Sequence, residues 1–242
     1  MRLLWLKLPV VTNMSKYLSE NFFARDPQVV ARALLGKVLK IKYQQRYLYA
    51  QIIETEAYYI HDKGSHASLG FTEKRKALFM APGTIYMYYA RGNDSLNFSC
   101  LGDGNAVLIK SGIPYLNGED YSGMIRQMQA LNPHPAGKIR PANRLCSGQT
   151  LLCRSLGLKV SDWNQKTMDK ERFSLMDCGY VPATIIQTTR LGIPKGRDEH
   201  LPFRFVDHLY APHCSSNPLT KRYASAGKTY HLLPHPFPPI TE

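Results

Sequence analysis

Residues 38–58 read VLKIKYQQRYLYAQIIETEAY, and this stretch decides the fold. Between Val38 and Lys42, apolar residues alternate with basic ones, which is the two-residue period of a half-buried strand. Gln44 and Gln45 then allow a turn, and the composition from Tyr47 to Ala57 again favours a strand. We therefore expect an antiparallel hairpin in this stretch.

A short amphipathic helix is expected just before the hairpin. Asp26 is suited to cap its amino terminus, Pro27 to open its first turn, and Gly36 to end it. Its apolar face would be formed by Val29, Val30, Ala33 and Leu34.

The elements that follow the hairpin are mixed. Residues 61–76 lack periodicity and are expected to form a loop, whereas the stretches 84–89 and 106–110 favour strands. Two helices are expected after Ser122 and Ser147, which can cap them. Since strands cluster early and helices late, without the alternation of a parallel sheet, the predicted fold class is α+β with a largely antiparallel sheet.

Length and composition fit one domain. The chain has 242 residues, of which 44% are hydrophobic and 11% aromatic, and this is enough to bury a sizeable core. We place the domain at residues 20–230, between an amino-terminal extension at 1–19 and a tail at 231–242. The tail is rich in proline and histidine and is expected to be flexible.

Positive charge points to a polyanionic partner. Lysine and arginine number 31 against 18 acidic residues, a net charge of +13, so nucleic acid is the first candidate. Between Asp120 and Asp162 there is no carboxylate, although several basic residues that could neutralise phosphates fall there. For any single one of them, a solvated basic face is the simpler explanation. They are Arg126, Lys138, Arg140, Arg144, Arg154 and Lys159.

Several classes of protein are disfavoured. The five cysteines have neither CxxC spacing nor the density of a disulfide scaffold, so we expect them to be reduced and the protein to be intracellular. Residues 1–11 resemble a signal peptide only faintly, because Lys7 interrupts the apolar run and no small-residue cleavage site follows. No apolar stretch is long enough to cross a bilayer, and nothing implies a metal or an organic cofactor.

Two carboxylates and a phenol alternate at the end of the hairpin. On a strand, Glu54, Glu56 and Tyr58 project from the same face. Spacing alone favours a solvent-facing sheet edge over catalysis, because a short Glu-x-Glu pattern is a weak motif. The surrounding sequence has to decide between the two.

Aromatic residues downstream could form a pocket for a flat base. His66 lies in the following loop, and residues 86–89 read YMYY, with phenols on both faces of a strand. Such rings can stack on an everted base and attract a cationic alkylated purine. For Tyr86 and Tyr89, an ordinary place in the strand with the hydroxyl at the surface is the better interpretation.

A series of motifs, each weak alone, gives a resemblance that covers residues 20–206. The chain resembles the alkyladenine (3-methyladenine) DNA glycosylase family, whose motifs occur here in the same order. They are Phe22-Phe23, Ala33-Leu34-Leu35-Gly36, Glu54-Thr55-Glu56-Ala57-Tyr58, Phe79-Met80-Ala81-Pro82-Gly83-Thr84, Gly102-Asp103-Gly104, Leu145-Cys146-Ser147-Gly148 and Arg190-Leu191-Gly192.

The resemblance implies a monofunctional enzyme of base-excision repair. Such an enzyme flips an alkylated or deaminated purine out of double-stranded DNA and hydrolyses its N-glycosidic bond, which leaves an abasic site. The resemblance also implies a single mixed domain with a curved antiparallel sheet flanked by helices, and no cofactor. We expect a monomer, located in the cytoplasm or with the nucleoid if the chain is bacterial.

The resemblance also assigns roles to single residues. Glu56 matches the general base that activates water, since an ionised carboxylate stabilises the oxocarbenium character of the sugar and orients the nucleophile. The walls that sandwich the flipped base match Tyr58, His66 and Tyr88. Asn97 falls near the family asparagine that clashes with the amino group of guanine, and Leu191 falls where a main-chain carbonyl helps to hold the water.

Two positions depart from the better-known vertebrate members. Lys110 stands where an arginine usually accompanies the catalytic water, so charge is kept but the planar fork of donors is lost. A lysine could also form a Schiff base, although we expect a monofunctional enzyme. Arg91 stands where a tyrosine fills the gap left by the flipped nucleotide. Either Arg91 acts as a polar wedge, or it contacts the DNA backbone while Tyr89 or Ala90 fills the gap.

Two other functions remain open at this point. A non-catalytic nucleic-acid-binding domain that recognises damaged DNA would equally explain the basic surface and the aromatic residues, but it does not require Glu56. A folate-dependent formyl-transfer accessory domain is suggested by analogy of fold alone. Among the basic residues, Arg144 is the one that we expect to join Arg91 and Tyr89 in contacting DNA.

Overall fold

The computed structural model describes residues 16–116, 120–238 and 240. Within these ranges, ten strands form a single sheet that does not close into a barrel, and every pair of strands is antiparallel. The predicted α+β class with an antiparallel sheet is therefore confirmed. The strands are β1 (Lys16–Tyr17), β2 (Val38–Tyr43), β3 (Arg46–Tyr58), β4 (Ile85–Ala90), β5 (Asn93–Ser99), β6 (Ala106–Pro114), β7 (Phe173–Asp177), β8 (Thr184–Thr188), β9 (Arg204–Asp207) and β10 (Tyr230–Pro234).

The helices in the described ranges are short. The α-helices are α1 (Pro27–Leu34), α2 (Tyr121–Leu131), α3 (Gln149–Ser155) and α4 (Val160–Trp163). The 3-10 helices are η1 (Glu20–Phe22), η2 (His66–Leu69), η3 (Glu73–Phe79), η4 (Ala142–Arg144), η5 (His208–His213) and η6 (Pro218–Thr220). None of these helices is long and apolar enough to span a membrane.

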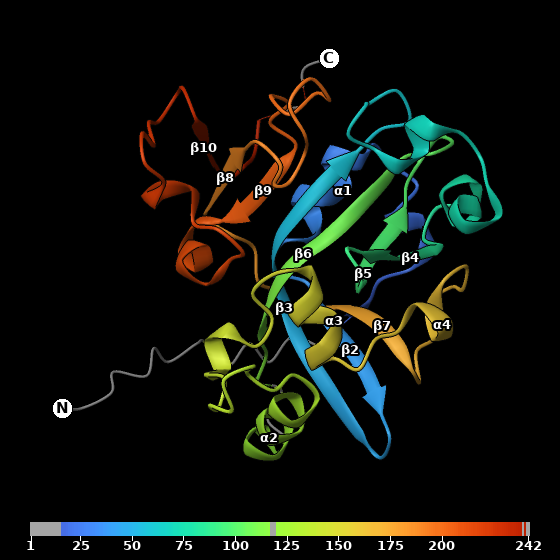
Figure 1. Cartoon of the computed structure of the whole chain (residues 1–242), viewed down its shortest axis with the longest axis vertical. Coiled ribbons are helices and arrows are strands. Elements are labelled where there is room, and N and C mark those ends of the chain that lie inside the picture. Colours follow the sequence, from blue (N-terminus) through green and yellow to red (C-terminus); the bar gives the residue numbers. More distant parts are fainter. Residues whose placement is uncertain (1–15, 117–119, 239, 241–242) are drawn as a thin grey trace.

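Strand β3 is the axis of the sheet. The predicted hairpin is confirmed, because β2 pairs with the first half of β3, from Arg46 to Gln51. Strand β9 takes over on the same edge and pairs with residues 54–56, while β6 accompanies β3 from Ala50 to Tyr58 on the other edge. The sheet thus divides at β3 into one wing with β2, β7 and β1 and another with β9, β8 and β10 (Figure 1).

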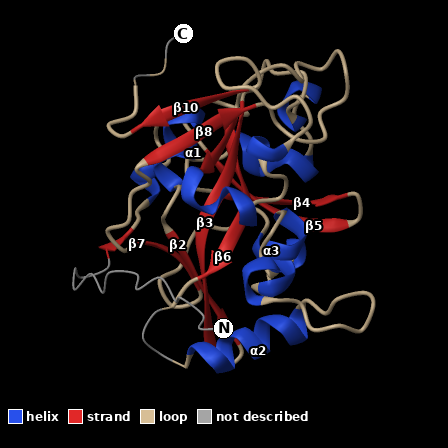
Figure 2. Ribbon diagram, turned by 90° about the vertical axis from the view of Figure 1, so that its left-hand side faces the viewer, coloured by secondary structure: helices blue, strands red, loops and turns tan. Residues whose placement is uncertain are grey.

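Helices cover both faces of the sheet around β6: α1 packs on β3 and β6 on one face, and α3 packs on β5 and β6 on the other (Figure 2). Helix α1 begins as predicted: the Asp26 carboxylate accepts hydrogen bonds from the backbone N–H groups of Gln28 and Val29 at 2.7 and 3.2 Å. Val30 and Leu34 are fully buried, whereas Val29, expected on the apolar face, is 36% exposed.

The predicted caps of α2 and α3 are wrong. Asp120, not Ser122, caps α2, because its carboxylate accepts a hydrogen bond of 2.8 Å from the N–H of Gly123. Gly148 precedes α3 with a φ of +105°, and the Ser147 hydroxyl donates instead to the carbonyl of His213. The sequence offers more than one residue that could cap each helix, and the tertiary contacts decide which residue takes that position.

Three expectations about segments are corrected. Strands do not cluster early, because β7 to β10 all lie in the last third of the chain. Residues 61–76 contain η2 and the start of η3 rather than only a loop. Residues 231–234, expected in a loosely held tail, pair with β8 as part of β10. Residues 1–15, most of the predicted extension, lie outside the described ranges, whereas Lys16 and Tyr17 pair with β7.

Candidate active site

The two acids of β3 lie deep in the sheet. Glu54 and Glu56 are both fully buried, so they do not form a solvent-facing edge. The Tyr58 hydroxyl, two residues further along β3, reaches Glu56, whereas Thr55 between the two acids donates a hydrogen bond of 2.9 Å to the carbonyl of Ala31 in α1. The alternation predicted from the sequence therefore holds here.

A bulge between β3 and β6 gives each acid its own partner. The register shifts between the pairs Glu54↔Ser111 and Thr55↔Ile109, so that Lys110 is the extra residue of β6. As a result, consecutive residues both reach the acids: Lys110 contacts Glu56, and the Ser111 hydroxyl donates to Glu54. A bulge commonly redirects side chains in this way next to functional sites.

Glu54 has a complete set of structural partners. Its Oε1 is 2.6 Å from Nε of the buried Arg204 and 2.7 Å from the hydroxyl of Ser215. Its Oε2 accepts hydrogen bonds from the Ser111 hydroxyl and, at 2.8 Å, from the N–H of Ser215. Burial alone would raise the pKa of Glu54, but Arg204 and these donors outweigh burial and hold the pKa below its usual value.

Glu56 has partners that line a pocket. Its Oε2 accepts a hydrogen bond of 2.6 Å from the Tyr58 hydroxyl, and its Oε1 accepts one of 3.2 Å from the N–H of Leu191. The Lys110 ammonium lies 3.4 Å from Oε1. Tyr58, Lys110 and Leu191 all line a cavity of about 760 Å³, so Glu56 lies directly behind its wall.

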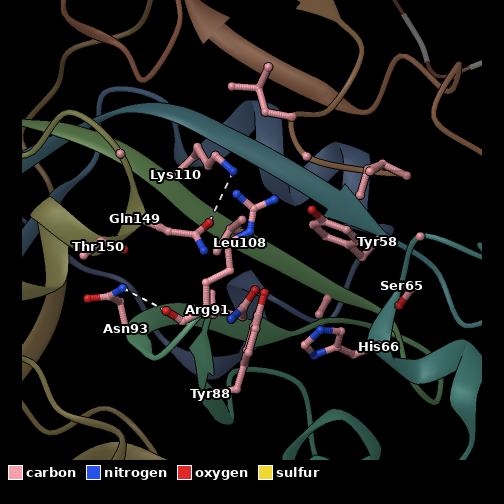
Figure 3. A pocket seen from close by; sticks show the side chains of 18 of the residues that line it. Tyr58, Ser65, His66, Tyr88, Arg91, Asn93, Leu108, Lys110, Gln149 and Thr150 are labelled. Carbon is pink, nitrogen blue, oxygen red and sulfur yellow. Dashed lines mark hydrogen bonds between the residues drawn. The ribbon is translucent and has the colours of Figure 1, made fainter. Parts of the chain in front are cut away.

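The opposite wall of this pocket is aromatic. The rings of His66 and Tyr88 have centroids 4.2 Å apart, and Tyr86 stacks on Tyr88 at 5.4 Å. Figure 3 shows Tyr58 on the other side of the opening from His66 and Tyr88. The three rings expected to hold a base thus share one cavity with a gap between them.

Tyr86 contributes more than the sequence indicated. It is 3% exposed, and its hydroxyl lies 3.0 Å from Nδ1 of His66, which fixes the orientation of that ring. Burial, followed by the charges of Arg75 and Arg197, lowers the pKa of His66 below its usual 6.5. The imidazole is therefore neutral at pH 7 and can lie against a base without adding charge.

Arg190 supports Tyr58 from behind. Its guanidinium carbon lies 4.6 Å from the Tyr58 ring centroid, and Asp62 pairs with the guanidinium, with Nη2 and Oδ1 2.9 Å apart. Arg190 and Asp62 are buried and Tyr58 is half-buried, which leaves one face of the Tyr58 ring for the pocket. The sequence assigned no role to Arg190 or Asp62, because 128 positions separate them.

The β4–β5 hairpin closes one side of the pocket. Arg91 and Gly92 form its turn with φ values of +50° and +76°, and the Arg91 side chain reaches into the pocket (Figure 3). Tyr89 also lines the pocket but is 62% exposed. Asn97 is 5% exposed, lines the same pocket, and donates a hydrogen bond of 3.1 Å to the carbonyl of Tyr86.

Arg144 lies apart from the other predicted site residues. It does not line the pocket, and its guanidinium donates a hydrogen bond of 3.1 Å to the carbonyl of Pro212 on an exposed part of the molecule. Within the described ranges, no group of three or more His, Cys, Asp or Glu side chains is placed to hold a metal ion, and the five cysteines are free.

Comparison with known proteins identifies the family of the chain. A family model described as methylpurine-DNA glycosylase matches residues 21–210. Relatives named "Putative 3-methyladenine DNA glycosylase" include one from Pseudomonas aeruginosa (strain LESB58), 57% identical over 91% of this chain and 92% of its own length. Another, from Pseudomonas syringae pv. tomato, is 58% identical over 91% of this chain and 98% of its own length. A third, from Koribacter versatilis, is 34% identical over 78% and 88%.

The matches to the relatives span most of both chains, and the family model covers the residues that line the pocket other than Ser215. They favour an enzyme over a non-catalytic DNA-binding domain. The chain belongs to the methylpurine-DNA glycosylase family, and it is a monofunctional DNA glycosylase of base-excision repair that hydrolyses N-glycosidic bonds.

Proposed function

We propose that the pocket receives an everted purine nucleotide and that Glu56 is the general base of the reaction. The observation that carries this proposal is the position of the Glu56 carboxylate. It is fully buried behind the pocket wall, and three neighbours hold it from the pocket side: Tyr58, Lys110 and Leu191.

The chemistry needs one carboxylate on the sugar side of the base. Glu56 accepts a proton from water while the water oxygen bonds to C1′ of the sugar and the bond from C1′ to the purine nitrogen breaks with its electron pair. The negative charge of Glu56 stabilises the developing oxocarbenium ion. The Lys110 ammonium compensates that charge when the nucleotide excludes solvent. The main-chain carbonyl of Leu191 is the second acceptor for the water.

The substrate class follows from the pocket walls. Tyr58 on one side and His66 with Tyr88 on the other suit a flat purine ring. Alkylated purines, 3-methyladenine among them, and deaminated purines such as hypoxanthine fit these walls. Asn97, near the inner end of β5, would meet the 2-amino group of guanine and exclude that base.

The partner is double-stranded DNA, bound by a monomer inside the cell. Arg91 and Tyr89 both line the pocket, on the hairpin that would face the duplex, and the net charge of +13 favours phosphate contacts. Arg91 fills the gap in the base stack as a polar wedge, and the exposed Arg144 contacts the backbone.

Glu56→Gln tests this proposal. Duplex DNA with a single hypoxanthine is incubated with each protein, and alkali then cleaves any abasic site. The variant should lose at least about 100-fold in single-turnover excision, because no base remains, while its Kd for the lesion duplex stays within a few fold. Glu171→Gln, at an exposed position, is the matched control. Undiminished excision by Glu56→Gln would remove Glu56 from the mechanism.

A further inference from the structure

Lys110 has a second acceptor besides Glu56. Its ammonium donates a hydrogen bond of 3.2 Å to Oε1 of Gln149, the first residue of α3 (Figure 3). The same ammonium lies 3.4 Å from Oε1 of Glu56. The Lys110 side chain is only 12% exposed, so these two acceptors hold an ammonium that has lost most of its water. Gln149 itself lines the pocket.

An ammonium needs such a second acceptor more than a guanidinium does. Lysine carries a compact charge on a flexible four-carbon stem, whereas the planar fork of arginine is oriented in advance. With Glu56 as its only partner, Lys110 could approach either carboxylate oxygen or turn towards the open pocket. Gln149 restricts the ammonium to the side of Oε1, which leaves Oε2 to the Tyr58 hydroxyl.

The backbone around Gln149 is tied to the bulge that carries Lys110. The N–H of Gly148, the residue before Gln149, donates a hydrogen bond of 2.9 Å to the hydroxyl of Ser111, the residue after Lys110. That hydroxyl in turn donates to the buried Glu54. This hydrogen bond therefore links the start of α3 to the β6 bulge, one residue away from the contact between Lys110 and Gln149.

We propose that Gln149 is a positioning residue for excision, which acts by holding the Lys110 ammonium against Oε1 of Glu56. This inference rests on the role of Glu56 and Lys110 proposed above. Gln149 then affects the rate of bond cleavage and not the affinity for DNA, and its whole effect on that rate passes through Lys110.

A double-mutant cycle tests both statements. Single-turnover excision of hypoxanthine from duplex DNA is measured for the unmodified protein, Gln149→Leu, Lys110→Met and the double variant. Gln149→Leu removes the acceptor and should slow excision about tenfold, with the Kd for the lesion duplex changed less than threefold. In the Lys110→Met background, the same substitution should change the rate less than twofold, because no ammonium remains to be held.

Two further variants distinguish loss of the Gln149 acceptor from a general loss of stability. Gln149→Asn keeps an amide at the start of α3 but moves the acceptor out of reach, so it should slow excision as Gln149→Leu does. Gln127→Leu makes the same change at a half-buried glutamine of α2 that does not line the pocket, and its rate should stay normal. Melting temperatures are compared throughout.

Each outcome bears on the proposal. An unchanged rate for Gln149→Leu and Gln149→Asn, an equal loss in the Lys110→Met background, or a loss confined to Kd would each overturn it. Glu56→Gln, measured alongside, separates the two levels of inference. If Glu56→Gln is inactive while the Gln149 variants are normal, only the role of Gln149 fails; if Glu56→Gln is active, the proposed site fails as well.

Discussion

The hydroxyl of Tyr58 donates a hydrogen bond of 2.6 Å to Oε2 of Glu56, two residues earlier on the same strand. The wall of the pocket and the buried carboxylate are thereby one unit. Burial and the adjacent Glu56 raise the pKa of Tyr58 well above its usual value, so the hydroxyl keeps its proton and remains a donor. Arg190, stacked behind the ring at 4.6 Å, limits its movement.

Tyr58→Phe should separate these two roles. The ring is kept, so we expect the Kd for a hypoxanthine duplex to change less than threefold. The variant loses the hydrogen bond to the charged Glu56, and a hydrogen bond to a charged group contributes about 1.5–3 kcal/mol. If that free energy is lost in the transition state, single-turnover excision should fall by about 10- to 100-fold. Tyr223→Phe, at an exposed position, is the control. A weaker Kd with a normal rate would contradict the orienting role of the hydroxyl.

Glu54→Gln should affect stability in a pH-dependent way. At pH 7 it leaves Arg204 buried without its charged partner, which costs about 3–5 kcal/mol of unfolding free energy. The pKa of Glu54 is lowered in the folded protein, so its contribution is complete above the unfolded value of about 4.3 and is lost as the pH falls through the folded value. The difference between variant and parent should therefore shrink in acid.

Urea unfolding at pH 7 and at about pH 3.5 measures this difference. Glu171→Gln, at an exposed position, should change neither value. An equal loss for Glu54→Gln at both pH values would show that the ion pair with Arg204 is not its cause.

The sequence predicted the parts of the site that depend on local period. Alternation along residues 46–58 is enough to put Glu56 and Tyr58 on one face, and the β2–β3 hairpin needs no distant contact. The resemblance to the family then supplied His66, Tyr88 and Leu191, each of which lines the pocket.

The residues that sequence reasoning missed act through distant contacts. Arg190 reaches Tyr58 and Asp62 across 132 and 128 positions, and Gln149 meets Lys110 from another element. The bulge at Lys110 depends on how β3 and β6 pair, which has no local signal. Strand β10 was not predicted, because the proline and histidine content around it is typical of a flexible tail. The strand forms through its pairing with β8.

His66 should make lesion selectivity depend on pH. Because its pKa lies below 6.5, the ring is neutral at pH 7 and gains a positive charge only in mild acid. A charged imidazole repels a cationic base but not a neutral one. The ratio of Kd values for 3-methyladenine, carried on a 2′-fluorinated sugar that resists hydrolysis, and for hypoxanthine should be constant from pH 8 to about 6.5 and rise below that.

Two substitutions identify the group responsible for this change. His66→Phe should make the ratio independent of pH. Arg75→Ala removes a charge that lowers the pKa of His66, so the rise should begin at a higher pH. Fluorescence anisotropy with both duplexes at each pH supplies the ratio, and a rise that survives in His66→Phe would exclude His66 as its origin.

Arg91 should act as the wedge that replaces the everted nucleotide. Its backbone lies in the left-handed region at the tip of the β4–β5 turn, and its side chain reaches the pocket that the nucleotide would enter. Arg91→Ala should weaken binding of a hypoxanthine duplex about tenfold and slow excision. Arg91→Lys distinguishes the two interpretations, because it keeps the charge but loses the planar group that stacks on bases.

If Arg91 is a wedge, Arg91→Lys resembles Arg91→Ala, and Arg91→Tyr restores binding because a ring can occupy the same gap. If Arg91 only contacts a phosphate, Arg91→Lys binds normally, whereas Arg91→Ala reduces the slope of log Kd against log salt by about one. Binding measured from 50 to about 200 mM salt gives both quantities. Normal affinity and excision in Arg91→Ala would exclude both roles and leave the gap to Tyr89 or Ala90, which also line the pocket.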